Sequence, residues 1–404
     1  MSALVAEPGP IEEIADALAT APLATFDLEF LAQDRLVPTL CLVQVSWLPA
    51  HMRLDVPAQA IVATPPEVAL LDPLAGDVRP VIEALAHHPN VVAHAARQDL
   101  GIIASRFGIA MPAITDTQVM AAFAGAGDQV GLATLANELL GLVLGKEHQW
   151  TDWSQRPLSD AQLAYADADV RHLPAIYAKL AARLGNRLPW ARAESSLVAA
   201  DAVAAASVTP ETAWRTIGGT RGMDAAQLAA LRELAAWRHR VAIELDRPLG
   251  WVVSEKSLVE LARQRPGSVE AIRGTKGISQ LVRQRASEVL AALQAAKPDD
   301  SVVPVALSRA PSSRAQRWSE ALLAIVQLVA EQTGVAARLL ATRADAEEFA
   351  RAVDEGGIEA ARGLPALATW RHEVIGKLWV DWLGGSLALV GDVRSPLGVS
   401  LVPR

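Results

Sequence analysis

The hydrophobic pattern of this 404-residue sequence changes its period near Gln98, and this change constrains the fold most. Upstream, short runs rich in apolar and β-branched residues have the length of strands, whereas downstream the apolar residues recur at helical spacing. The expected strands, with one helix among them at Gly76–His87, are Leu23–Phe30, Thr39–Trp47, Val68–Leu71 and Val91–His94. The pattern predicts an α/β domain of about 180 residues followed by all-helical sequence.

Two signals bound the longest helix of this first domain. Ser159 stands where a helix-capping side chain is expected, and Gly185 stands where the helix would end. We therefore expect one long helix between them. Tyr165 and Asp169 are four residues apart on that helix, so they would share one face of it.

The helical remainder contains an internal repeat. Trp251–Arg263 (WVVSEKSLVELAR) aligns without gaps to Leu339–Arg351 (LLATRADAEEFAR), 88 positions later. In both copies an apolar run leads to Ser or Thr at a capping position and then to an amphipathic helix. A segment rich in Pro, Ser and Asp, Lys297–Ser313, separates the copies. We expect a first domain over residues 1–220, a helical unit over 221–298, a linker over 299–313 and a second, divergent unit over 314–404.

Composition narrows the class of protein. No apolar run reaches the roughly 18 residues needed to cross a bilayer, and residues 1–13 carry acid where a targeting peptide would carry base. The single cysteine, Cys41, fits a reducing compartment, so we expect a cytoplasmic protein. The net charge of −8 argues against a protein that coats nucleic acid, although Asp224–Glu288 is locally basic, with 11 Lys or Arg against 8 Asp or Glu.

Four carboxylates and a tyrosine form the expected site. Asp27 and Glu29 end the first strand as Asp-x-Glu and point to one face of it. Asp99 stands at a strand-to-helix junction, and Asp169 follows Tyr165 on the long helix. Acids in apolar sequence repel each other unless a cation neutralises them, and oxygen ligands suit Mg²⁺. Two such cations about 4 Å apart can cleave a phosphodiester, and Tyr165 could orient or deprotonate the attacking water.

Each of these residues also has an ordinary structural interpretation. Asp-x-Glu is common at strand ends, and Asp99 could be an acid that favours a helix start. Tyr165 and Asp169 could be an ordinary helix face, and Asp167 between them is expected in solvent. The metal interpretation is preferred because the four acids occur together, in this order, within one α/β domain.

The motifs around these acids resemble those of the DEDD exonuclease superfamily, and specifically the ribonuclease D family. The matching segments are DLEF (27–30), PTLCLVQV (38–45), HAARQDL (94–100), DTQVMAAFAGAGDQVGLATL (116–135), KEHQWTDWSQRPLS (146–159) and YADADVRHL (165–173). Tyr165, four residues before the last Asp, matches the tyrosine branch of the superfamily. Leu28 departs from the small residue usual between the first Asp and Glu, and its bulk could alter how the terminal nucleotide seats.

The resemblance implies a ribonuclease H-like 3′-5′ exonuclease domain with a mixed sheet. By that resemblance, Asp27, Glu29, Asp99 and Asp169 would hold two Mg²⁺ or Mn²⁺ ions, and Tyr165 would position the attacking water. The implied activity is release of nucleoside 5′-monophosphates from a single-stranded 3′ end of RNA, in tRNA 3′ processing, by a monomer. A DNA 3′-5′ exonuclease and a catalytically inactive RNA-binding scaffold remain the alternatives.

The two helical units resemble HRDC domains, all-α bundles that would guide structured RNA to the site. The matching segments are WRHRVAIELDRPLGWVVSEKSLVELA (237–262) and, more weakly, TWRHEVIGKLW (369–379). The residues expected to contact nucleic acid are Lys146, Gln149, Arg156, Arg238, Arg240, Arg273, Lys276, Arg283 and Arg285. The alternative for each is an ordinary solvated side chain. Cys41 and the tryptophans at helical spacing are expected in the core.

Overall fold

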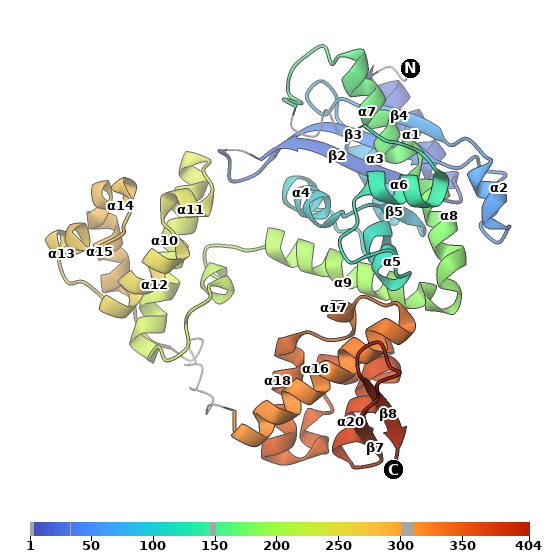
Figure 1. The fold of residues 1–404 in the computed structure, drawn as a ribbon. Coiled ribbons are helices and arrows are strands. Elements are labelled where there is room, and N and C mark those ends of the chain that lie inside the picture. The colour runs from blue at the N-terminus through green and yellow to red at the C-terminus, as the bar shows by residue number, and fades with distance from the viewer. Residues whose placement is uncertain (1–3, 33, 146–150, 300–310) are drawn as a thin grey trace.

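A six-stranded sheet forms the centre of the first domain in the computed structural model, which describes residues 4–32, 34–145, 151–299 and 311–404 (Figure 1). The strand order is β1-β4-β3-β2-β5-β6. The β2–β3 and β3–β4 pairs are antiparallel, whereas β1–β4, β2–β5 and β5–β6 are parallel, so the sheet is mixed as expected. The strands are β1 (Leu4–Val5), β2 (Ala24–Leu31), β3 (Thr39–Trp47), β4 (Glu67–Leu71), β5 (Val91–Ala93) and β6 (Ile114–Asp116).

Helices cover both faces of this sheet. Helices α1, α3 and α4 pack against one face, where Phe26 of β2 and Val43 of β3 are fully buried with them. Helices α7 and α8 lie across the other face. The helices of this domain are α1 (Pro8–Thr20), α2 (Ala58–Val62), α3 (Arg79–His87), α4 (Arg97–Phe107), α5 (Thr117–Phe123), α6 (Leu132–Leu140), α7 (Asp160–Arg171), α8 (Leu173–Leu184), the 3₁₀ turn η1 (Gly185–Arg187) and α9 (Leu188–Ala206).

The expected long helix is two helices. Ser159 caps α7 in a capping box with Gln162, and α8 ends at Gly185, so both predicted boundaries are confirmed. The helix breaks between them at His172, and Pro174 lies in the first turn of α8. A proline lacks the N–H of a helix interior but is tolerated at a helix start, which explains the break. Both Tyr165 and Asp169 remain on α7.

The internal repeat is confirmed as a repeated set of helices. Helices α10 and α16 begin at residues 225 and 313, α11 and α17 at 249 and 337, and α12 and α18 at 255 and 343, each pair offset by 88. Ser254 caps α12 and Thr342 caps α18, as the alignment predicts. The first unit comprises η2 (Ala213–Thr216), α10 (Ala225–Leu245), α11 (Leu249–Val252), α12 (Glu255–Gln264), α13 (Val269–Gly274), α14 (Gln280–Gln284) and α15 (Ala286–Ala295).

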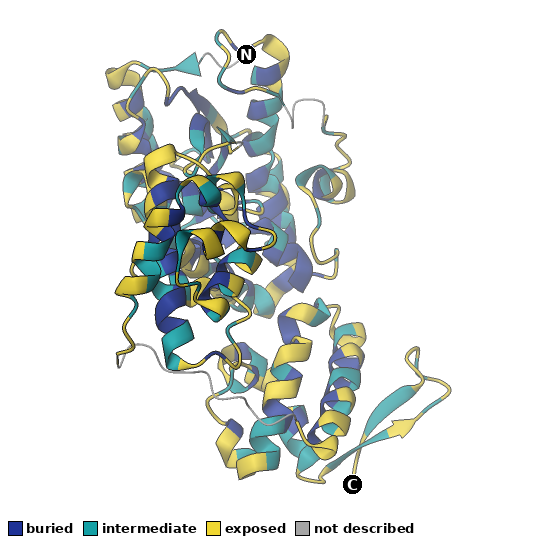
Figure 2. Cartoon of the chain, turned by 90° about the vertical axis from the view of Figure 1, so that its left-hand side faces the viewer, coloured by how far each residue is buried: buried dark blue, intermediate teal, exposed yellow. Residues whose placement is uncertain are grey.

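The second unit is not all helical, which corrects the expectation. After its helices it ends in a two-stranded antiparallel hairpin of largely half-buried and exposed residues, which projects from the body in Figure 2. Trp237, Trp370 and Trp379 lie in the core as expected, but Trp251 is 56% exposed. The elements are α16 (Ser313–Thr333), α17 (Ala337–Leu340), α18 (Arg343–Gly356), η3 (Ile358–Ala361), η4 (Pro365–Leu367), α19 (Thr369–Arg371), the π-helix η5 (His372–Gly376), α20 (Lys377–Leu383), β7 (Leu387–Gly391) and β8 (Val399–Pro403).

The two units join the first domain in different ways. The second shares a core with it: the Trp370 ring stacks on Trp190 with centroids 5.7 Å apart and meets Phe123 edge-on at 4.9 Å. Arg371 there donates to both carboxylate oxygens of Glu194 at 2.8 Å. The first unit instead contacts the tip of the β2–β3 hairpin, where the Leu36 N–H donates to Asp246 at 3.3 Å (Figure 1).

Within the described part of the chain, no single helix combines the length and the apolar composition needed to span a bilayer. The segments Ser313–Thr333 and Ala337–Gly356 meet that requirement only when joined, and they are bent by 118° at the break between them.

Candidate metal centre

Strand β2 presents its two acids on the face that α7 covers. Asp27 and Glu29 are two residues apart, so their side chains share a face with Thr25. Leu28 points to the opposite face, where it is 4% exposed in the core with α1, α3 and α4. Its bulk therefore does not face the carboxylates, and the expected effect of Leu28 on nucleotide seating is wrong.

Two hydroxyls fix α7 above these acids. Thr25 of β2 and Ser46 of β3 are a cross-strand pair whose hydroxyl oxygens lie 2.7 Å apart. The Ser46 hydroxyl donates to the Val170 carbonyl at 3.0 Å, at the end of α7. Because Asp169 immediately precedes Val170, this contact sets the height of the Asp169 carboxylate over the sheet.

Asp99 enters from α4, at the end of β5. It lies in the first helical turn and is 7% exposed. Just before the helix, Ala95 has a φ of 54°, a left-handed conformation that residues with a Cβ rarely adopt. The Asp116 carboxylate holds that turn by accepting the N–H groups of Ala95 and Ala96 at 2.9 and 3.0 Å, and it also caps α5 through the N–H of Gln118 at 2.8 Å.

The predicted acids therefore meet. Oxygen atoms of Asp27, Glu29 and Asp169 lie within 4.8 Å of one another, close enough to hold one ion. Asp99 is outside that group of three but close enough for Asp27 and Glu29 to raise its pKa. The Tyr165 hydroxyl hydrogen-bonds to Asp169 from one turn earlier on α7.

Burial shifts the pKa of every acid in the cluster upward, and neighbouring carboxylates add to the shift of Glu29, Asp169 and Asp99. Burial raises the pKa of Asp27 to about 7. Burial and the charges of Asp27 and Asp169 raise the pKa of Glu29 to about 9. The pKa of Asp169 rises to about 8 through burial and the charge of Asp27, although the hydrogen bond from Tyr165 opposes the shift. For Asp99, burial and then the neighbouring carboxylates raise the pKa.

The causes of these pKa shifts indicate whether a divalent cation fits the acidic cluster. The shifts arise from burial and from like charges, so neutralising the cluster requires either protons or positive charge brought from outside. The donors are carboxylate oxygens, which suit hard divalent cations. Burial and the same acids also raise the pKa of the Tyr165 phenol, which therefore stays protonated at neutral pH and acts as a donor. This favours the orienting role for Tyr165 over the role of a base.

Several residues expected to contact nucleic acid have protein partners instead. Arg156 donates to both oxygens of Asp72 at 2.7 Å and to the carbonyl of Cys41, so it ties its loop to the sheet. Arg238 is 3% exposed inside the first unit, which removes it from the set that can reach a phosphate. Arg285 pairs with Glu244 at 2.6 Å.

The remaining expected contacts fall into three groups. Arg240, Arg273 and Lys276 are exposed on the first unit. Arg283 is half-buried and donates to the Arg273 carbonyl. Lys146 and Gln149 lie outside the described residues.

Sequence reasoning missed the polar residues that support the acids. Thr25, Gln44 and Ser46 each stand between apolar residues of β2 and β3, and Gln44 and Ser46 are two apart in TLCLVQVSW, so they share a face. That spacing was the available signal. Asp167, expected in solvent, pairs with Arg171 and its side chain is only 16% exposed.

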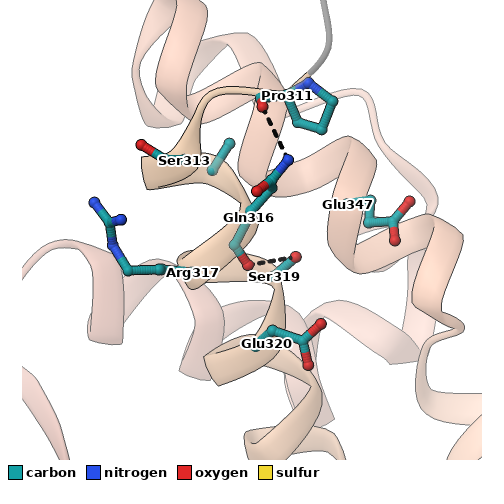
Figure 3. Close-up of a pocket in the computed structure, with 8 residues that line it drawn as sticks. Pro311, Ser313, Gln316, Arg317, Ser319, Glu320 and Glu347 are labelled. Carbon is teal, nitrogen blue, oxygen red and sulfur yellow. Dashed lines mark hydrogen bonds between the residues drawn. The ribbon is translucent and has the colours of Figure 1, made fainter.

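A surface cavity of about 510 Å³ lies elsewhere, at the start of α16. Figure 3 shows Gln316 at its wall, donating to the Pro311 carbonyl at 3.3 Å, with Glu347 of α18 opposite. None of the expected site residues lines this cavity. It is therefore separate from the acidic cluster.

Comparison with known protein families finds matches for two regions of the chain. Residues 10–185 match the family model described as 3′-5′ exonuclease, and residues 227–293 match that of the HRDC domain. All four acids and Tyr165 fall inside the first match. The second match covers the first helical unit.

Full-length relatives are also found. The ribonuclease D of Acidiphilium cryptum is 36% identical over 393 residues, which cover 94% of this chain and 93% of the relative. That of Granulibacter bethesdensis is 33% identical, with 96% and 94% covered. The crystal structure of Escherichia coli ribonuclease D, described as an exoribonuclease involved in structured RNA processing, superposes with a TM-score of 0.78 at 26% identity, covering 95% of this chain and 99% of that one.

Proposed function

This chain belongs to the ribonuclease D family, and from that premise we propose that it is a metal-dependent 3′-5′ exoribonuclease whose active site is the cluster around Asp27. The observation that carries the proposal is the convergence of carboxylate oxygens of Asp27, Glu29 and Asp169 within 4.8 Å, beside buried Asp99. The products are nucleoside 5′-monophosphates.

Each residue of the cluster has a distinct task in this proposal. Asp27, Glu29, Asp99 and Asp169 would hold two Mg²⁺ or Mn²⁺ ions, which would supply an activated water and stabilise the leaving 3′ oxygen. The protonated Tyr165 phenol, which donates its one hydrogen to Asp169, would accept a hydrogen bond from the attacking water and so orient it. The terminal nucleotide enters as a single strand, because a duplex end would have to open first.

The division of the chain supports this function. We propose a catalytic domain over 1–220, an HRDC domain over 221–298, a linker over 299–313 and an HRDC-like unit over 314–404. Exposed Arg240, Arg273 and Lys276 would contact phosphates of the RNA, for which tRNA precursors are the proposed source. We further propose that the protein acts as a monomer in the cytoplasm, where the buried free thiol of Cys41 stays reduced.

The test is degradation of a uniformly labelled oligoribonucleotide with Mg²⁺, with Mn²⁺ and with EDTA. We expect mononucleotides as the products, no reaction in EDTA, and no reaction with Asp169→Asn. Asp167→Asn is the matched control, because it removes an acid of the same helix that pairs with Arg171 instead. Full activity of Asp169→Asn would refute the site assignment.

A matched DNA oligonucleotide separates the alternatives. Faster release from DNA than from RNA would make the protein a DNA exonuclease with the same site. RNA binding without any release, in the presence of either cation, would make it an inactive scaffold.

A further inference from the structure

Gln44 is a buried polar side chain without a partner. It is 0% exposed, and neither its amide nitrogen nor its amide oxygen has a hydrogen-bonding partner among the described residues. Buried side-chain amides are almost always hydrogen-bonded, because an unpaired one loses its bonds to water without replacement. Among the described residues, the amide therefore still needs a partner.

The sheet register places this amide beside the acidic cluster. Gln44 of β3 is the direct cross-strand partner of Asp27 of β2. Side chains directly opposite each other in an antiparallel pair lie on one face, with Cβ atoms about 5 Å apart. The next pair on the same face, Thr25 and Ser46, confirms this orientation, since its hydroxyl oxygens are 2.7 Å apart under α7.

Within the sheet, the other neighbours of Gln44 on this face are apolar or already hydrogen-bonded, except on the β2 side. On the far side its partner in β4 is Leu70, and Leu42 is two residues away on its own strand; both are fully buried. The Ser46 hydroxyl is engaged with Thr25 and the Val170 carbonyl. On β2, the Asp27 carboxylate is the polar group directly opposite the amide, and Glu29 lies one position further along the same face.

We propose that Gln44 is a positioning residue of the metal centre, whose amide hydrogen-bonds to the Asp27 carboxylate once a divalent cation is bound. This inference rests on the proposed metal site. A carboxylate that ligates a metal is usually held by a further hydrogen bond, which fixes its orientation and tunes its basicity. An uncharged amide suits that role here because it adds no charge to the cluster.

The experiment measures Mn²⁺ binding by calorimetry and thermal unfolding in EDTA, for the parent and for Gln44→Met. Methionine keeps the length and burial of the side chain and removes the amide. We expect Mn²⁺ affinity to fall about 10- to 100-fold, while the unfolding temperature in EDTA stays at or above that of the parent, because the ion-free protein loses no hydrogen bond.

Two further variants complete the test. Ser319→Ala removes a different buried polar group, which donates to the Gln316 carbonyl in the second unit, and should leave Mn²⁺ affinity unchanged. In an Asp27→Asn background, Gln44→Met should cause little further loss of Mn²⁺ affinity, because its partner has already changed. Gln44→Leu replaces Gln44→Met should the methionine variant not fold.

The outcomes separate this inference from the proposed function. Unchanged Mn²⁺ affinity of Gln44→Met, or a lower unfolding temperature in EDTA with unchanged affinity, would overturn the positioning role and leave the metal centre intact. Absence of Mn²⁺ binding by the parent would overturn the proposed function itself.

Discussion

Protonation of the carboxylates in the cluster makes the free energy of unfolding depend on pH. The pKa values of Asp27, Asp169 and Glu29 lie at about 7, 8 and 9, above the ordinary 3.8 and 4.5 that apply in the unfolded chain. Between these limits the folded protein binds more protons than the unfolded one, so its free energy of unfolding falls as the pH rises. Without a bound cation, the protein therefore loses stability over the pH range in which its carboxylates lose their protons and become able to ligate a cation.

We predict that the free energy of unfolding in EDTA, measured with urea at about pH 5, 7 and 9, falls less steeply for Asp27→Asn than for the parent. The comparison with the variant is needed because burial lowers the pKa of His94 and His172, which makes stability rise with pH in the lower half of this range. Saturating Mn²⁺ should reduce the decrease in the free energy of unfolding that the parent shows as the pH rises. Identical slopes for parent and variant would show that Asp27 does not titrate as proposed.

Tyr165 gives a second prediction at this scale. Tyr165→Phe keeps the ring, whose centroid lies 6.1 Å from that of Trp153, and removes the hydroxyl that donates to Asp169. We expect kcat to fall by about 100-fold, since a misplaced nucleophile costs roughly that much, with Mn²⁺ affinity retained. An unchanged rate constant for cleavage in single-turnover assays would reduce Tyr165 to a packing role.

Among the elements, α4 depends on a contact from outside itself. The Asp116 carboxylate accepts three backbone N–H groups, two from the turn before α4 and one from the start of α5. We predict that Asp116→Ala lowers the free energy of unfolding by about 2 to 3 kcal/mol, since a helix cap and two further hydrogen bonds are lost. Asp116→Asn keeps one acceptor oxygen and should lose less; an equal loss for both variants would contradict this account.

Elements with a strong pattern could be predicted from the sequence, and short or context-dependent ones could not. The expected Thr39–Trp47 strand matches β3 without error, because seven of its nine residues are apolar or β-branched and leave little ambiguity. β6 was missed because three residues, Ile114–Asp116, show no period. The hairpin β7–β8 was missed because it follows a long helical stretch and depends on pairing across its turn.

The same limit applies to the site. The acids and Tyr165 could be found because motif spacing places them on the ends of recognisable elements. Gln44, Thr25 and Ser46 act through cross-strand pairing, and the register of β2 against β3 cannot be read from either strand alone. The burial of Arg238 depends on the packing of α10 within the first unit, which helical spacing alone does not fix.

For the whole molecule, the contact between the second unit and the catalytic domain is the stronger of the two joints. The side chains of Arg371 and Glu194 are 17% and 13% exposed and lie 2.8 Å apart, and Trp370 packs beside them. We predict that Arg371→Met lowers the free energy of unfolding by about 3 to 5 kcal/mol, because it leaves Glu194 buried and unpaired. The double variant Arg371→Met and Glu194→Met should recover most of that loss in urea unfolding.

The contact with the first unit is weaker and gives a matched comparison. Arg35 and Asp246 are 3.6 Å apart with exposed side chains, so Asp246→Ala should change the free energy of unfolding by no more than about 1 kcal/mol. Faster amide hydrogen exchange at Leu36, whose N–H donates to Asp246, should be the main effect. If Asp246→Ala lowered the free energy of unfolding as much as Arg371→Met does, the two contacts with the catalytic domain would be equally strong.

The stacking of Trp370 on Trp190 also has a consequence for synthesis on the ribosome. Trp190 and Phe123 belong to the catalytic domain, but the ring that covers them is translated 180 residues after Trp190 and 247 residues after Phe123. At a synthesis rate of about 5 to 20 residues per second, that apolar surface stays uncovered on the nascent chain for on the order of 10 to 35 s after Trp190 is added. During that interval the emerging catalytic domain offers a binding surface to chaperones, and the arrival of Trp370 removes it.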